Sequence, residues 1–166
     1  METDAYREII FPRGIVGCPN WRTFRLFPEP FEYCGELVSV DQPGVVLVVA
    51  EPAWLRIEYR FELDEDDAEA LGLRSPEDAR VLSVLTIHRD PAAIIANLAG
   101  PLVINWNKCI GRQVVLDHQA YPLRLPVLTG AAAQMLVNAL HDGTRDETGR
   151  ADASEITPSQ QMGKGA

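Results

Sequence analysis

The stretch "NLAGPLVINWNKCIGRQVVL", residues 97–116, places two apolar runs on either side of a polar segment. The polar segment supplies Asn105, Asn107 and Gly111, which are residue types that form tight turns between paired strands. Asparagine side chains also commonly satisfy the backbone groups of such turns. The stretch therefore predicts a β-hairpin rather than an active-site loop, and we expect a fold rich in sheet.

A second strand signal lies in "LRIEYRFEL", residues 55–63, where apolar and charged residues alternate without exception. A period of two predicts an antiparallel strand with one face in water. Residues 45–49 and 81–87 are β-branched and more continuously apolar, as buried strands are. Shorter strands are predicted at 8–11, 23–27, 36–40, 94–98, 102–105 and 113–117.

Glycine and proline separate these segments at short intervals, most clearly as Pro43 with Gly44 and Gly100 with Pro101. Many short strands divided by such turn residues indicate an all-β sandwich or barrel, mainly antiparallel. Strands that alternate regularly with long helices are absent from the pattern. A doubly wound fold is therefore disfavoured.

Helices are predicted to be few. Residues 64–73 indicate a short helix with acidic residues in its first turn and Gly72 as its stop, and Ser75 followed by Pro76 predicts the start of another. The longest predicted helix covers residues 131–141, with Ala132, Leu136 and Leu140 as its apolar stripe. We expect residues 1–143 to form a single domain and residues 144–166, which are almost without apolar side chains, to be a disordered tail.

The chain carries 24 acidic and 15 basic residues, for a formal net charge of −9. Phosphate backbones repel such a surface, so direct nucleic-acid binding is disfavoured. A basic protein partner is favoured, because opposite net charges accelerate encounter, although the charge could equally serve solubility alone. The sequence contains neither a run of apolar residues long enough to span a membrane nor a signal peptide. We therefore expect a cytoplasmic protein with no membrane partner.

Motifs of known chemistry are missing from the sequence: there is no phosphate-binding glycine loop, no HExxH and no GxSxG. The three histidines and three cysteines are scattered, so we expect no metal site and no cofactor. Cys34 or Cys109 could in principle act as a nucleophile beside a histidine. Nothing in the sequence fixes that geometry, and unpaired cysteine is among the most commonly buried residue types.

Several stretches together resemble the FliW family of flagellar assembly factors. Residues 97–105 resemble the family's Asn-Leu-x-x-Pro-x-x-Ile-Asn signature, and the opening "FPRGIVG" is similar to its Phe-Pro-x-Gly start. The resemblance covers about residues 9–127. It is carried by the order and spacing of "FPRGIVG", "LFPEPF", "SVDQPGVVLVVAEP", "LGLRSPEDARVLSVLTI", "NLAGPLVIN", "GRQVVLD" and "YPLRLP".

The resemblance implies an all-β pseudo-barrel that is not an enzyme. The few short helices and the C-terminal helix predicted above complete the expected fold. It also implies two protein partners: flagellin, and CsrA, a basic RNA-binding dimer that regulates translation. In this family the factor sequesters CsrA when flagellin is scarce, and free flagellin displaces it. The residues expected at the partner-binding site are those of the signature and its hairpin: Asn97, Leu98, Pro101, Ile104, Asn105, Trp106 and Gln113.

Two other interpretations remain open. Val38, Ile95 and Leu125 stand where the family commonly has glutamine, threonine and histidine, which is compatible with a FliW-like binding module whose protein partner has changed. A thiol-dependent enzyme built on Cys34 or Cys109 is the third. The asparagines and proline of the signature could also be structural devices of turns and strand edges.

Overall fold

The computed structural model describes residues 5–31 and 34–143 of the chain. These residues form eight strands, two α-helices and one short 3₁₀ helix. Their bounds are β1 (Arg7–Ile10), β2 (Thr23–Phe31), β3 (Cys34–Ser39), β4 (Val46–Ala50), α1 (Glu65–Leu71), η1 (Pro76–Asp78), β5 (Ala79–Arg89), β6 (Ala92–Asn105), β7 (Ile110–Gln113), β8 (Leu125–Thr129) and α2 (Gly130–Gly143).

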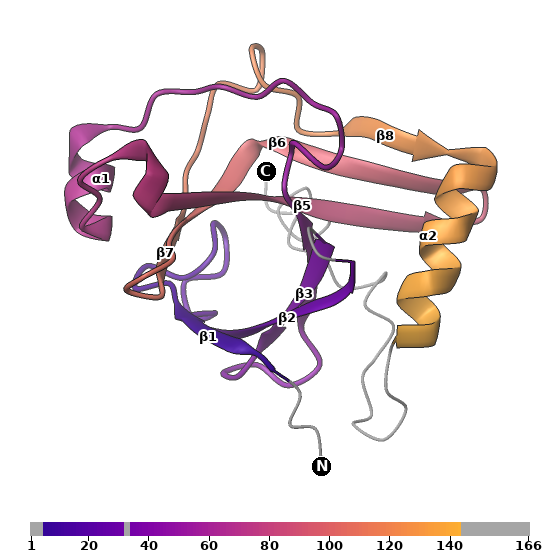
Figure 1. Cartoon of the computed structure of the whole chain (residues 1–166), viewed down its shortest axis with the longest axis horizontal. Helices are drawn as coiled ribbons and strands as arrows, with labels where there is room; N and C mark the ends of the chain where they lie inside the picture. The colour runs from indigo at the N-terminus through magenta and orange to yellow at the C-terminus, as the bar shows by residue number, and fades with distance from the viewer. Residues whose placement is uncertain (1–4, 32–33, 144–166) are drawn as a thin grey trace.

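Seven strands close into a ring, which Figure 1 views nearly along its axis. The order is β5-β4-β3-β2-β1-β7-β6, and β6 pairs with β5 to complete the circle. All these pairings are antiparallel except that of β1 with β7, where Ile10 faces Ile110 in parallel. The predicted fold class, a mainly antiparallel pseudo-barrel with few helices and a C-terminal helix, is confirmed.

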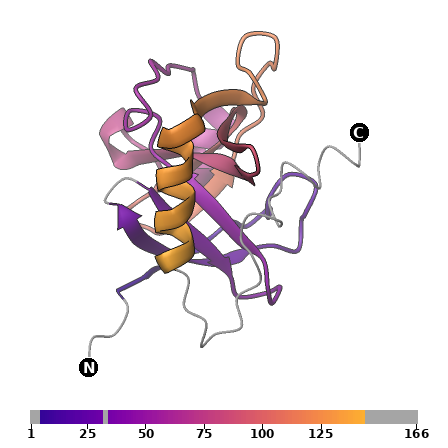
Figure 2. The same cartoon turned by 90° about the vertical axis from the view of Figure 1, so that its right-hand side faces the viewer.

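Buried side chains form three clusters around this ring. The first fills the barrel and includes Phe11, Phe24 and Leu102, each fully buried. The second lies outside the ring between β5, β6, β8 and α2, and the third lies under α1. Figure 2 shows α2 running along one side of the strands. Closing the barrel removes free strand edges and positions the ends of several strands at one mouth.

Strand β6 is a single strand of 14 residues, so the turn predicted at Gly100 and Pro101 is wrong. The pairing with β5 shifts there: Leu82 faces Leu102, but Val84 faces Asn97. The four residues 98–101 therefore stand opposite the single residue Ser83, which is three more than a regular ladder would hold, and they form a bulge. Proline has no amide hydrogen to donate, and it is tolerated in a strand at such a bulge.

Residues 55–63 do not form the predicted strand, although their alternation is real. Odd-numbered residues from Leu55 to Leu63 are partly buried and even-numbered ones are exposed, but no neighbouring strand pairs with this segment. The segment instead crosses the outside of the sheet, where Ile57 and Tyr59 pack on the second cluster. Alternation reports which side chains are buried and does not report backbone pairing.

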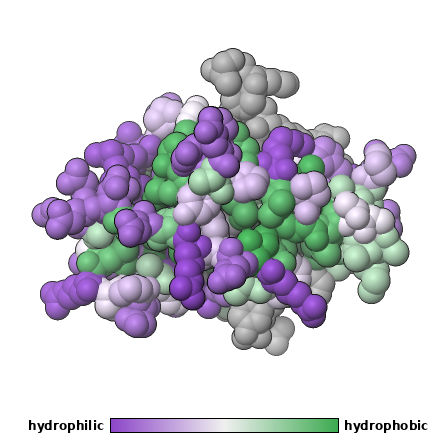
Figure 3. Space-filling model, turned by 90° about the horizontal axis from the view of Figure 1, so that it is seen from above, coloured by the Kyte–Doolittle hydropathy of each residue, from purple (hydrophilic) through white to green (hydrophobic). Residues whose placement is uncertain are grey.

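The upper surface of the molecule is formed partly by this crossing segment and by the connection between β7 and β8. Seen from above, apolar groups run between charged ones along the middle, and the end that carries α1 is hydrophilic (Figure 3). Val115 and Leu123 of the connection are 72% and 50% exposed. The strand predicted at residues 113–117 is found earlier, at Ile110–Gln113, because it pairs with Leu102–Asn105.

The helices follow the predictions with one correction. Gly72 ends α1 in the left-handed conformation, at a φ of 67°, and Pro76 opens η1, after which the chain turns at once into β5. In α2 the buried residues are Ala133, Leu136 and Val137, whereas the predicted Ala132 is exposed. Alanine is equally compatible with either face of a helix, so the stripe could not be placed within one residue.

Two further features complete the description. Among the described residues, no helix combines the length and the apolar character required to cross a bilayer. Helix α2 ends at Gly143, and the predicted tail, residues 144–166, lies outside the described residues, so the division into domain and tail stays a prediction.

Candidate functional site

A cavity of about 250 Å³ opens at one mouth of the barrel. The ends of five strands contribute to it, together with the residue that follows β6. Its apolar floor includes Leu26, Val49 and Leu82, which also belong to the cluster that fills the barrel. The remaining lining residues are Ala5, Tyr6, Arg7, Pro28, Cys34, Gly35, Glu51, Arg80 and Trp106.

Trp106 stands at the rim of this cavity between two arginines. The guanidinium carbons of Arg7 and Arg80 each lie 4.2 Å from the centre of its ring system. The Nη1 atom of Arg7 also donates a hydrogen bond of 3.0 Å to the carbonyl oxygen of Trp106. Cation–π contacts on both sides hold the indole in one orientation.

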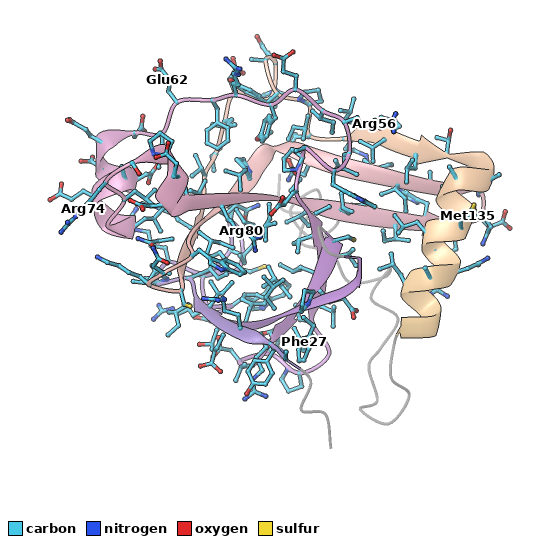
Figure 4. All side chains as sticks on the ribbon, viewed as in Figure 1. Phe27, Arg56, Glu62, Arg74, Arg80 and Met135 are labelled. Atoms are coloured by element: carbon cyan, nitrogen blue, oxygen red, sulfur yellow. The ribbon has the colours of Figure 1, made fainter. Side chains whose placement is uncertain are left out.

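The rim carries more positive than negative charge, although the chain as a whole is acidic. Arg80 forms an ion pair of 3.4 Å with Glu51, and in Figure 4 it is labelled within the ring, beneath β5. Arg7 pairs with no carboxylate among the described residues. Its Nη1 atom contacts the Trp106 carbonyl and, at 3.5 Å, the sulfur of Cys109.

Asn97 and Gln113 hold the bulge of β6. The Oδ1 atom of Asn97 accepts hydrogen bonds of 3.0 Å from the amides of Ala99 and Gly100. Gln113 donates from Nε2 to the Gly100 carbonyl at 3.0 Å and accepts from the Val16 amide at 2.9 Å. A Cβ on Gly100 would lie 2.8 Å from the Gln113 amide nitrogen, so a larger residue there would push the Gln113 side chain from its present position.

Asn105 performs a similar task between β6 and α1. Its Nδ2 atom donates to the carbonyl of Leu71 at 2.8 Å, at the end of α1, and its Oδ1 atom accepts from the amide of Lys108 at 3.2 Å. A second link ties α1 to β7, because Arg112 and Asp67 form a largely buried ion pair of 2.6 Å. The asparagine therefore shapes the turn that carries Trp106 to the rim.

Residues 1–127 match the model of the FliW protein family. The chain belongs to the FliW family of flagellar assembly factors. The flagellar assembly factor FliW of Clostridium beijerinckii is 32% identical over 126 residues, which cover 75% of this chain and 89% of that protein. The FliW of an Exiguobacterium species is 33% identical over 139 residues, covering 81% and 92%.

A crystal structure of the flagellar assembly factor FliW has the same fold. It superposes with a TM-score of 0.66 at 28% identity and covers 79% of this chain and 90% of that one. The FliW family model ends before β8 is complete, so α2 lies beyond the residues that the model matches. The barrel, its bulge and its mouth all lie inside the shared part.

The seven residues predicted for the FliW partner site fall into two groups. Six of them are buried, and their polar side chains are bonded to the chain's own backbone. Trp106 is only partly buried and lines the cavity. As direct partner contacts the seven stay a prediction, and the geometry gives the six an internal role: Asn97, Leu98, Pro101, Ile104, Asn105 and Gln113.

Sequence reasoning missed the two arginines of the FliW mouth. Arg7 and Arg80 lie far from Trp106 along the chain and meet it only because β1, β5 and the β6–β7 turn end at the same mouth. Each arginine lies one residue before a predicted strand, and a charged residue there gives no signal of its own, because solvated faces carry such residues routinely. Their pairing with tryptophan requires the closed ring.

Cys34 and Cys18 of this FliW chain do not offer an activated thiol. Burial, with a smaller contribution from Glu36, raises the pKa of the Cys34 thiol to about 12, and burial also raises the pKa of Cys18. A catalytic cysteine requires the opposite shift, toward thiolate. Among the described residues, no three histidine, cysteine, aspartate or glutamate side chains gather in a way that could hold a metal ion.

Proposed function

We propose that this FliW family member is a cytoplasmic, non-enzymatic protein that binds CsrA and flagellin in competition. When flagellin is scarce, the free factor sequesters CsrA and relieves translational repression. When flagellin is again free, it displaces CsrA from the factor, and the released CsrA restores translational repression. Flagellin synthesis is thereby coupled to assembly without a cofactor, a metal, direct nucleic-acid contact or a membrane.

The observation that carries the proposal is the match to the family over residues 1–127, with the signature polar residues present and built into the barrel. The net charge of −9 supports a basic partner such as CsrA, because long-range attraction raises the association rate. The raised pKa of Cys34 speaks against a thiol enzyme built on that residue. Within the predicted site, the position of the partly buried Trp106 in the lining of the cavity supports a role for it in partner contact.

Isothermal titration calorimetry of the full chain with purified CsrA, and separately with flagellin monomer, tests the proposal. We expect saturable binding of both proteins and a loss of CsrA heat when the factor is preloaded with flagellin. Raising the salt concentration should weaken the CsrA complex, because exposed charges are screened. Absence of heat with both partners at micromolar concentrations would refute the proposal.

The second candidate is a FliW-like module that has exchanged its partner. Val38, Ile95 and Leu125 depart from the family pattern, and all three are partly exposed on the strands rather than buried. The triple variant Val38→Gln, Ile95→Thr, Leu125→His restores the common residue types. If the partner has changed, this variant should bind CsrA or flagellin more tightly than the natural chain. Equal affinities would remove the reason for this candidate.

A further inference from the structure

We infer that the barrel mouth binds the C-terminal residue of a polypeptide, with an apolar side chain in the cavity and the terminal carboxylate on Arg7. The inference follows from the cavity's size, its lining and one guanidinium. The inference rests on the proposed function in one respect only: both require a polypeptide ligand.

The floor of the cavity is apolar. It consists of Leu26, Val49 and Leu82, which are 7%, 1% and 6% exposed and are part of the packed barrel interior. A C-terminal residue carries its side chain and its free carboxylate on the same Cα, which matches an apolar floor beneath a guanidinium at the rim.

The size of the cavity suits one side chain. A volume of about 250 Å³ lies just under the roughly 300–1,000 Å³ that is typical of pockets for small molecules and cofactors. The apolar floor favours an aliphatic or aromatic group, because burying it removes apolar surface from water on both sides. A long basic side chain would bring its charge close to Arg80 at the rim and to Arg7.

Arg7 supplies the recognition of charge. Its Nη1 atom is occupied by the Trp106 carbonyl and the Cys109 sulfur, but its Nε and Nη2 atoms donate to no described residue. These two atoms form the edge that grips a carboxylate through parallel hydrogen bonds. The half-buried guanidinium is fixed in place by the Trp106 ring, so little side-chain freedom is lost when a ligand binds.

Arg80 and Glu51 complete the rim. Arg80 is stacked on the other side of Trp106 and is neutralised by Glu51, so it positions the indole and leaves Arg7 as the cation without a described carboxylate partner. The titratable groups that line the cavity are Tyr6, Arg7, Cys34, Glu51 and Arg80. A single incoming carboxylate therefore balances the charge of the mouth.

Fluorescence anisotropy with synthetic peptides tests this assignment on the full chain. The probe is a fluorescein-labelled hexapeptide of glycine and serine that ends in phenylalanine with a free carboxylate. Three controls are the same peptide with an amidated C-terminus, one that ends in lysine, and one with aspartate followed by phenylalanine in its interior and an amidated end. We expect the free acid to bind at least about tenfold more tightly than each control.

Protein variants provide the matching arm. Arg7→Gln should weaken the free-acid peptide about tenfold or more and leave the amidated peptide unchanged. Arg124→Gln removes the same charge from an exposed position outside the cavity and should change neither. If Arg7→Gln does not fold, the comparison of free acid with amide on the natural chain still decides the question.

The outcomes separate this inference from the proposed function. Equal binding of the free-acid and amidated peptides, or no binding of either, overturns the assignment of the mouth, and so does tighter binding of the interior aspartate peptide. Full-length CsrA and flagellin are titrated beside the peptides. If both proteins bind while the peptides do not, the proposed function stands and the assignment of the mouth is refuted. If only the free-acid peptide binds, the assignment of the mouth stands and the proposed function is refuted.

Discussion

At the scale of single residues, Asn105 links three parts of the molecule through one amide side chain. It is 3% exposed, donates to the end of α1 and accepts from the turn that precedes β7. Replacing it with alanine leaves the Leu71 carbonyl without this donor inside the protein. We expect Asn105→Ala to lower the free energy of unfolding by about 1–3 kcal/mol in urea denaturation.

Asn107 is the matched control for this prediction, since it lies in the same turn and is exposed. Asn107→Ala should change the free energy of unfolding by less than about 0.5 kcal/mol. Equal effects of the two substitutions would show that the Asn105 bonds contribute nothing specific.

Cys34 makes stability depend on pH in the alkaline range. Burial raises its pKa to about 12 in the folded protein, from an ordinary value of 9.0. Between these values the unfolded chain loses the thiol proton while the folded protein keeps it, so stability falls as pH rises from about 9. Burial also raises the pKa of Tyr59, which adds to the decline.

Chemical denaturation of the natural chain and of Cys34→Ala between pH 8 and 11 checks this expectation. The variant will be less stable at pH 8 because its side chain is smaller, but its stability should fall less steeply with pH. Parallel curves would contradict the assigned shift. In the folded protein, Cys34 should also react with thiol reagents more slowly than a free thiol does, whereas an enzyme nucleophile would react faster.

The predicted site shows what residue patterns can and cannot reveal. Asn105 and Asn107 predicted the turn between β6 and β7 correctly because turn chemistry is local, whereas Gly111 lies inside β7. The partner of the Asn105 side chain is 34 positions away, at Leu71, and no local pattern announces it. The same holds for Arg7 and Trp106, which are brought together by barrel closure alone.

At the scale of elements, the crossing segment 55–63 separates burial from pairing. It has strand-like alternation without a neighbouring strand, so its amide groups lack ladder hydrogen bonds. In native-state hydrogen exchange, we expect its amides to exchange with deuterium far faster than the amides of residues 81–87 within β5. Comparable protection of the two segments would mean that 55–63 is paired after all.

Helix α2 is tied to the sheet through one face. Leu136 is 4% exposed and packs in the second cluster, while its neighbour Met135 is 74% exposed on the outer side (Figure 4). Leu136→Ala should lower the free energy of unfolding by about 2–5 kcal/mol. Met135→Ala should change it by about 0.5 kcal/mol or less. Thermal or urea unfolding measures both, and similar losses would refute the packing of α2.

Sequence periodicity predicted α2 and most strands. It failed where the pairing of strands in the folded protein decides the local structure. The bulge at residues 98–101 was predicted as a turn, because glycine followed by proline has the same local meaning in both settings. Strand β8 was not predicted, since "LPVLT" contains a proline and is short. Its place beside β6 depends on the edge that β6 leaves open next to Asn97.

At the scale of the whole molecule, closure turns an acidic chain into a scaffold with a basic mouth. The parallel contact of β1 with β7 completes the ring through residues 100 positions apart, at Ile10 and Ile110. The amide of Ile10 also donates to the Cys109 carbonyl at 3.0 Å. Composition and turn spacing predicted the fold class, whereas this closing contact and the mouth it creates are global properties.

The central claim is that this FliW family member binds a polypeptide at the barrel mouth. Hydrogen–deuterium exchange of the full chain, alone and saturated with CsrA or flagellin, tests it most directly. The account predicts added protection in β1 and in the turn between β6 and β7, where Arg7 and Trp106 lie. A saturated complex in which both segments exchange as in the free protein would contradict it.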